Sequence, residues 1–327
     1  MKSALLIGAV RSGSTSCFYG AAQHPDIFVP AQKELDFWLR DDAGALPHWL
    51  SPAVANRVPA TLEDYLRHFA AARPNQATFD ASPNVFYDHG AAARVRTALP
   101  DARIVAVLRQ PVDLCWSAWC AHLGGQPPLH DATGQFVAAL ERPPTAYPLM
   151  QYGMQAWHLE PWLAQFPASQ VLVMLFDDLR DAPDKFFARL FAHIGVDWAQ
   201  VTPRRMNRTG SPRAPLLHRL LNDGVAAKRW ARAVLPAPAV RLALALHHRL
   251  REVNLQPPPG LPSWLRAELT ELFYADDLRR LERLLDRDLS LWRVRERQVA
   301  RARATSLSPG CQSQQEARQR AMASPAR

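Results

Sequence analysis

The sequence predicts an α/β fold of three layers, in which helices cover both faces of a central parallel sheet. Four short apolar runs rich in Val, Ile, Leu and Phe are typical of buried strands, and the segments between them have the periodicity of helices. Strands that alternate with helices form parallel βαβ units. Because ligands bind at the carboxyl ends of such strands, the residues that follow each apolar run are the first candidates for function.

The elements follow in chain order. The expected strands are Ala4–Ile7, Thr78–Asp80, Arg103–Leu108 and Val171–Phe176. The helices expected among them are Leu62–Ala71, Ala91–Leu99, Val112–His122, Met154–Gln165 and Pro183–Ile194. After about residue 200 the pattern becomes helical and rich in proline, with helices expected at Leu216–Leu221, Val240–Leu250 and Ser263–Arg287. Few apolar residues follow Trp292, so we expect one folded domain over residues 1–292 and a disordered tail over 293–327.

Composition and charge restrict the class of protein. Of the net charge of +9, residues 293–327 carry +6, from eight Arg against two Glu, which leaves +3 for the domain. A basic end on a nearly balanced body predicts a solvated tail and no specific nucleic-acid partner. The four cysteines have no C-x-x-C spacing, which favours a reducing compartment and argues against structural zinc. No apolar run approaches the roughly 18 residues of a membrane span. We therefore expect a cytoplasmic protein.

The stretch GAVRSGSTS at residues 8–16 follows the first expected strand and is similar to a phosphate-binding loop. Gly8 and Gly13 have the spacing of G-x-x-x-x-G-K-[ST], but Ser14 stands at the position of the lysine, and the positive charge is at Arg11. A glycine turn that opens a helix directs backbone N–H groups at an anion, and the nearby hydroxyls of Ser12, Ser14, Thr15 and Ser16 add donors. Without the lysine, the loop favours a smaller anion that needs no Mg²⁺.

A second candidate anion site begins where the strand Arg103–Leu108 ends. Arg109 follows this strand directly, and Pro111 is typical of the first turn of a helix. Ser117 comes eight residues after Arg109, about two turns into that helix. An arginine fork and a hydroxyl together suit a phosphate group. From the residues alone, an ion pair of Arg109 with Asp113 is the alternative.

These two elements together resemble those of sulfotransferases that use 3′-phosphoadenosine-5′-phosphosulfate (PAPS), the heparan-sulfate type and its bacterial relatives. Further similarity lies in QKELDFW at 32–38, DASPNVFYD at 80–88, the stretch 151–179 and LRRLERLLDRDLSLW at 278–292. The resemblance implies a P-loop-like fold, PAPS as donor with PAP as product, no metal, and a carbohydrate or small-molecule acceptor. It implies that the loop holds the 5′-phosphosulfate and that Arg109 and Ser117 hold the 3′-phosphate.

The same resemblance implies the catalytic residues. Glu34 would be the general base, Arg11 would stabilise the leaving phosphate in place of the family's usual lysine, and Lys33 would face the acceptor or the transferred group. Asp36 is the alternative base. Additional cofactor contacts are expected in NRTGSPR at 207–213, from the residues Arg208, Thr209 and Gly210.

Two other functions are compatible with parts of the sequence. A nucleotide-dependent kinase with a degenerate P-loop would use the same loop, although it would need a lysine near residue 14. A binding protein could attract an anionic partner through the basic tail, and its binding would then depend strongly on salt. The sequence contains no pattern that identifies the acceptor or the oligomeric state.

Overall fold

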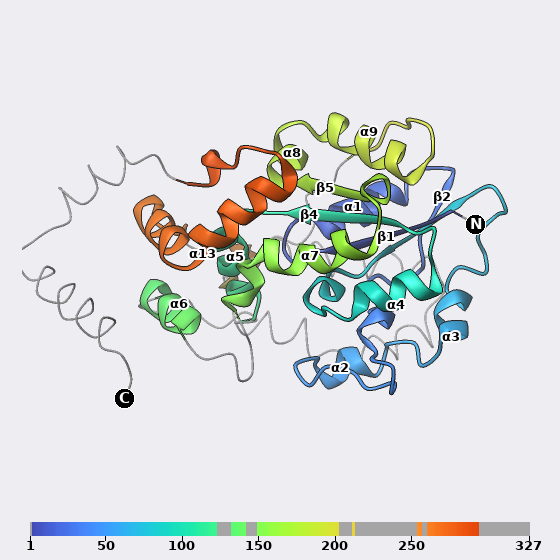
Figure 1. The fold of residues 1–327 in the computed structure, drawn as a ribbon, viewed down its shortest axis with the longest axis horizontal. Coiled ribbons are helices and arrows are strands. Elements are labelled where there is room, and N and C mark those ends of the chain that lie inside the picture. The colour runs from blue at the N-terminus through green and yellow to red at the C-terminus, as the bar shows by residue number, and fades with distance from the viewer. Residues whose placement is uncertain are drawn as a thin grey trace, which may run out of the picture. The chain divides into compact units, whose positions relative to one another are not determined.

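The computed structural model of the chain describes residues 2–122, 132–141, 149–202, 211–212, 254–256 and 260–293. The chain consists of two compact units, Met1–Gly260 and Leu261–Arg327. The first unit is built on a parallel five-stranded sheet with the order β2-β3-β1-β4-β5 (Figure 1). Its strands are β1 (Ser3–Gly8), β2 (Ile27–Phe28), β3 (Ala77–Ala81), β4 (Arg103–Leu108) and β5 (Val171–Leu175). The expected α/β fold with a central parallel sheet is confirmed.

Helices cover this sheet on both sides (Figure 1). Among the described residues of the first unit, the α-helices are α1 (Ser14–Ala21), α2 (Pro52–Ala55), α3 (Leu62–Arg67), α4 (Ala91–Ala98), α5 (Pro111–His122), α6 (Ala132–Glu141), α7 (Gln155–Gln165), α8 (Phe176–Asp181) and α9 (Pro183–Ile194). Short 3₁₀ turns lie at η1 (Phe37–Leu39), η2 (Pro83–Tyr87), η3 (Gln151–Gly153) and η4 (Ala168–Gln170). A two-residue ribbon pairs β6 (Ser211–Pro212) with β7 (Leu255–Gln256). The helices expected at Leu216–Leu221 and Val240–Leu250 lie outside the described residues.

The main apolar core lies between the sheet and the helices α1, α8 and α9. Its strand residues alternate along β1, β3 and β4, as the pleat requires, and its helical side is formed by Phe18, Leu179 and the apolar face of α9. The intervening strand residues, such as Leu5 and Ile104, are also buried, and α4 and α7 lie on that side of the sheet (Figure 1). A sheet buried on both faces is typical of parallel strands.

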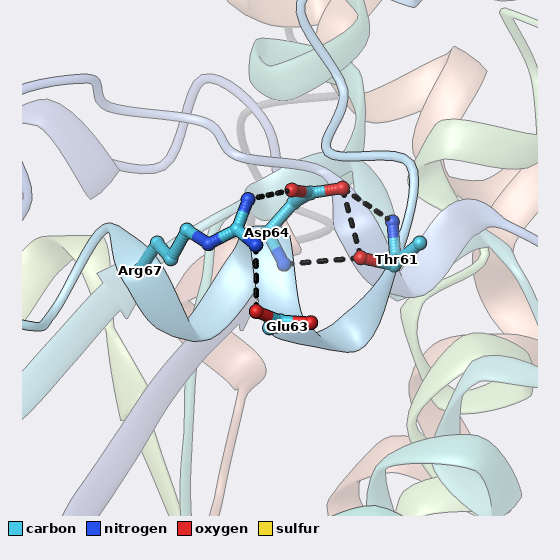
Figure 2. A network of polar contacts seen from close by, with 4 residues as sticks. All are labelled: Thr61, Glu63, Asp64 and Arg67. Atoms are coloured by element: carbon cyan, nitrogen blue, oxygen red, sulfur yellow. Dashed lines mark hydrogen bonds and ion pairs between the residues drawn. The ribbon is translucent and has the colours of Figure 1, made fainter.

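Helix α3 begins with a local hydrogen-bond network (Figure 2). The Thr61 hydroxyl oxygen accepts the N–H of Asp64 at 3.1 Å, and the Asp64 carboxylate accepts the N–H of Thr61 at 3.2 Å. Arg67 donates to Asp64 and to Glu63 from the last turn. This capping box satisfies helix-end donors that would otherwise have no partner. It fixes the start of the helix that carries Tyr65, a residue that contacts the site described below.

The described part of the second unit, residues 261–293, contains the long helix α13 (Ser263–Leu285) and the turn η5 (Ser290–Trp292). The Glu282 carboxylate accepts the Leu289 N–H at 3.2 Å and pairs with Arg293 at 2.8 Å, which holds the turn against the end of the helix. Residues 294–327, most of the predicted tail, lie outside the described residues, so the predicted domain boundary stays a prediction. None of the described helices combines the length and the apolar character that a membrane crossing requires.

Candidate functional site

The loop between β1 and α1 ends at a glycine that no other residue could replace without strain. Gly13 is the N-cap of α1 and has a φ of 92°. A Cβ at this position would lie 2.7 Å from the Cδ2 atom of Leu179. The first helical hydrogen bond runs from the Cys17 N–H to the Gly13 carbonyl at 3.0 Å. The amides of residues 14–16 therefore precede the first helical donor, and the positive end of the helix dipole is presented at this loop.

Arg11 connects this loop to the second predicted anion element. Its backbone is left-handed, with a φ of 59°. Its Nε donates to the Ser117 hydroxyl on α5 at 3.1 Å, and its carbonyl accepts from Nη1 of Arg109 at 2.8 Å. Ser12 is fully buried, and its hydroxyl donates to the Val10 carbonyl at 3.3 Å. The residues that the sequence divided between two phosphate sites thus form one continuous cluster.

Arg109 is held from three directions. Its N–H donates to Gln155 Oε1 at 2.9 Å, and Gln155 Nε2 donates back to the Arg109 carbonyl at 2.6 Å. Its guanidinium lies over the ring of Phe176, 4.7 Å from the centroid. Burial lowers the pKa of Arg109 from its ordinary value, and an arginine remains a cation even so. Gln155 and Phe176 were not found from the sequence, because neither belongs to a local motif.

Lys33 and Glu34 lie at the end of β3, the neighbour of β1 in the sheet. Glu34 has a left-handed φ of 62°, and its N–H donates to the Ala81 carbonyl at 3.2 Å. The Lys33 ammonium forms an ion pair with the Glu34 carboxylate. The Lys33 side chain is 14% exposed and that of Glu34 is 43% exposed, so the carboxylate is the more accessible partner. The Glu34 carboxylate is therefore partly open to solvent.

Tyr87 supports the loop from the turn η2. Its hydroxyl accepts the Val10 N–H at 3.2 Å, and a Cβ at Gly8 would lie 2.5 Å from the side chain of the adjacent Phe86. The Tyr87 ring makes an edge contact with His158, with centroids 4.9 Å apart. Burial lowers the pKa of His158 to about 4, so this ring is neutral near pH 7. Tyr87 thus bonds to the loop at Val10, and Phe86 packs against Gly8 at the end of β1.

The neutral His158 ring also fixes the orientation of a second histidine. His158 Nε2 lies 3.0 Å from the Gln151 carbonyl, which can only accept, so the proton of the neutral ring is assigned to Nε2. Nδ1 must then accept from Nε2 of His89, at 3.1 Å. This chain of bonds joins η3 and α7 to the segment that carries Tyr87.

The structure brings together most of the residues predicted for the site. Ser14, Thr15 and Ser16 form the first turn of α1, beside Arg11 and Ser117. Arg208, Thr209 and Gly210 lie outside the described residues, so their proposed role is not placed. Within the described ranges, no group of three or more His, Cys, Asp or Glu side chains is arranged to hold a metal ion.

Comparisons with known proteins agree with the family resemblance drawn from the sequence motifs. The family model described as "Sulfotransferase family" matches residues 4–200, more than half of the chain. Heparan sulfate glucosamine 3-O-sulfotransferase 3A1 of Mus musculus is 24% identical over 202 residues, which cover 59% of this chain and 45% of that protein. Bifunctional heparan sulfate N-deacetylase/N-sulfotransferase 4 of Mus musculus is 26% identical over 300 residues, 82% of this chain and 31% of that protein. The chain thus spans less than half the length of these two relatives.

A solved structure extends the likeness of the fold to most of the chain. The sulfotransferase from Alicyclobacillus acidocaldarius superposes with a TM-score of 0.60 at 24% identity, covering 88% of this chain and 97% of that one. The family match confirms the resemblance drawn from the loop, from Arg109 with Ser117, and from the segment around Glu34. This chain belongs to the sulfotransferase family.

Proposed function

We propose that this chain transfers a sulfuryl group from PAPS to a hydroxyl or amine of a carbohydrate or small-molecule acceptor, with Glu34 as general base. The observation that carries the proposal is the joined cluster of Arg11, Arg109 and Ser117 at the N-terminal end of α1. Family membership favours this reaction over phosphoryl transfer from a Mg²⁺-bound nucleotide. The cytoplasmic location suggested by the cysteines stays a prediction.

The donor set of the cluster fits a doubly phosphorylated nucleotide. Two guanidinium groups, the positive end of α1 and several hydroxyls are all hydrogen-bond donors, and an anion with several oxygens satisfies such donors best. Arg11 and the loop would hold the 5′ end, and Arg109 with Ser117 would hold the 3′-phosphate. PAPS, when bound, supplies an activated sulfuryl group whose bond to the 5′-phosphate breaks as the bond to the acceptor forms.

The chain's own residues would then do two things. Arg11 and the amides of the loop stabilise the negative charge that develops on the departing phosphate, since preorganised donors act most strongly where charge appears. Glu34 takes the proton of the acceptor hydroxyl or amine as the new bond to sulfur forms. Lys33, the ion-pair partner of Glu34, would face the acceptor or the transferred sulfuryl group.

Calorimetry with PAP, the product nucleotide, tests the donor directly. We expect PAP to bind the wild type and to bind the double variant Arg11→Gln/Arg109→Gln at least a hundredfold more weakly, since about two charge-assisted hydrogen bonds are lost. Arg103→Gln is the matched control, because Arg103 begins the strand that Arg109 follows and its Nη1 donates to the Ser169 carbonyl. Absence of heat with the wild type, or an unchanged affinity of the double variant, would refute the proposal.

A turnover screen tests the reaction. The wild type is incubated with PAPS and a panel of sugars, phenols and amines, and release of PAP is measured. Release that depends on one acceptor class supports sulfuryl transfer and identifies the class. Binding of PAP with no acceptor-dependent release from any class would contradict an enzymatic role.

A further inference from the structure

A buried polar cluster that the proposed reaction does not use lies next to Lys33 and Glu34. Asp36 is fully buried, and its N–H donates to the Ser82 hydroxyl at 3.1 Å. Ser82 in turn donates to Asp80 Oδ1 at 2.8 Å, and Asn84 Nδ2 donates to Asp36 Oδ2 at 3.0 Å. Within the part of the chain that the structure describes, Oδ1 of Asp36 has no hydrogen-bond partner. Burial of a carboxylate with an oxygen that has no hydrogen-bond partner costs folding free energy, so we expect a role that would explain it.

The groups around this cluster determine the pH range in which its carboxyl groups are ionised. Lys33 and Glu34 face Asp36 from its own segment, Asp80 faces it from β3, and the Tyr65 hydroxyl on α3 donates to Asp80 at 3.4 Å. Burial is the main cause that raises the pKa of Asp36 to about 7, and the nearby carboxylates raise it further. Burial likewise raises the pKa of Asp80 to about 6. The cluster therefore gains its last negative charge in the neutral range.

Lys33 is the cation that acts on both of these acids, and it is the partner of Glu34 as well. Its charge favours the ionised forms of Asp36 and Asp80, and its side chain is mostly buried. The ammonium group is thus paired with Glu34 and acts electrostatically on the two buried acids. When Asp36 loses its proton to solvent, the attraction of Lys33 toward the interior increases.

We propose that Asp36, supported by Asp80, is a positioning residue that acts through Lys33: its carboxylate draws the ammonium away from Glu34 and leaves Glu34 able to accept the acceptor's proton. This inference rests on the proposed function of Glu34. Asp36 is fully buried and is not placed to touch the acceptor, so it acts on the Lys33–Glu34 ion pair alone.

The pH dependence of turnover tests this role. We expect the wild-type kcat to rise about tenfold between pH 6 and pH 8 with an inflection near 7, as Asp36 ionises. Asp36→Asn cannot ionise, so its profile should lack this inflection and its kcat at pH 8 should be about tenfold lower. Asp42→Asn, which removes an exposed carboxylate nearby in the sequence, should keep the wild-type profile. An inflection retained in Asp36→Asn, or a loss of rate that is equal at every pH, would overturn the inference.

Two further measurements do not depend on the activity of Asp36→Asn. Asp80→Asn removes a charge that opposes ionisation of Asp36, so the inflection should move to lower pH; an unmoved inflection would contradict the role of Asp80. Carbon-detected NMR of the unliganded wild type should show an aspartate carboxyl that titrates near pH 7 and is missing from Asp36→Asn. Calorimetry with PAP separates the two proposals: binding by the wild type without the pH effects refutes only this inference, whereas absence of binding refutes the proposed function.

Discussion

Replacing Asp36 by asparagine should stabilise the folded chain at alkaline pH and much less at acidic pH. The pKa of Asp36 is raised from 3.8 to about 7 by burial, so the folded state holds a proton that the unfolded state has already released. A raised carboxyl pKa contributes stability at low pH, and that stability is lost as the pH rises through the folded value. Between pH 5 and pH 7 this gap covers about two pH units at ~1.4 kcal/mol each. The wild type should therefore lose about 3 kcal/mol more than Asp36→Asn between pH 5 and pH 8.

Urea denaturation followed by tryptophan fluorescence at pH 5, 6, 7 and 8 measures this difference. Asn keeps the shape of Asp, so the acceptor for Asn84 is retained and only the ionisable proton is lost. Asp42→Asn provides the control, since an exposed carboxylate should shift the free energy of unfolding by a small and nearly constant amount. Parallel stability curves for the wild type and Asp36→Asn would show that Asp36 does not hold a proton in the folded state, and the reasoning would fail.

Three other substitutions probe the site. Glu34→Gln should lower kcat by about 10²–10⁴-fold while PAP affinity is unchanged, and a normal rate would remove Glu34 from the role of base. Gly13→Ala forces a Cβ to 2.7 Å from Leu179 at a φ of 92°, so it should cost about 1–3 kcal/mol in thermal denaturation and weaken PAP binding. Arg11→Lys keeps the charge but has no Nε to donate to Ser117, so PAP affinity should fall about tenfold in calorimetry, and equal affinity would show that charge alone matters.

The sequence predicted the elements whose signal is local. Strand β4 (Arg103–Leu108) and helix α9 (Pro183–Ile194) have the predicted bounds, because a continuous apolar run and a helical apolar face define them without help from the rest of the chain. Strand β2 was missed, since two residues at a sheet edge leave no pattern. Helix α1 was expected only as an opening after the loop, because its first turn consists of Ser and Thr, which are weak helix formers.

In the candidate site, too, the sequence predicted the residues that belong to local motifs and missed those placed by long-range contacts. Arg11, Arg109 and Ser117 stand in short motifs at strand ends, and their types already indicate anion binding. Asp36 stands in a segment with two other charged residues, and nothing local indicates that it is buried. Its hydrogen bonds go to Ser82 and Asn84, more than 40 residues later in the chain. The bond from Val10 to Tyr87 likewise joins positions 77 residues apart. Contacts of this kind come from the packing of the sheet edge, which no local pattern records.

The order of the strands gives the proposed reaction a direction. At the carboxyl edge of the sheet, β3 ends beside Glu34 and the two buried aspartates, β1 ends in the loop, and β4 ends at Arg109. The proposed proton acceptor Glu34 thus lies on one side of the loop and Arg109 lies on the other. A sulfuryl group that leaves the 5′-phosphate held by Arg11 and the loop would move toward the side that carries the proton acceptor. Because the order of neighbouring strands fixes this arrangement, the proposed direction of transfer does not depend on which acceptor binds.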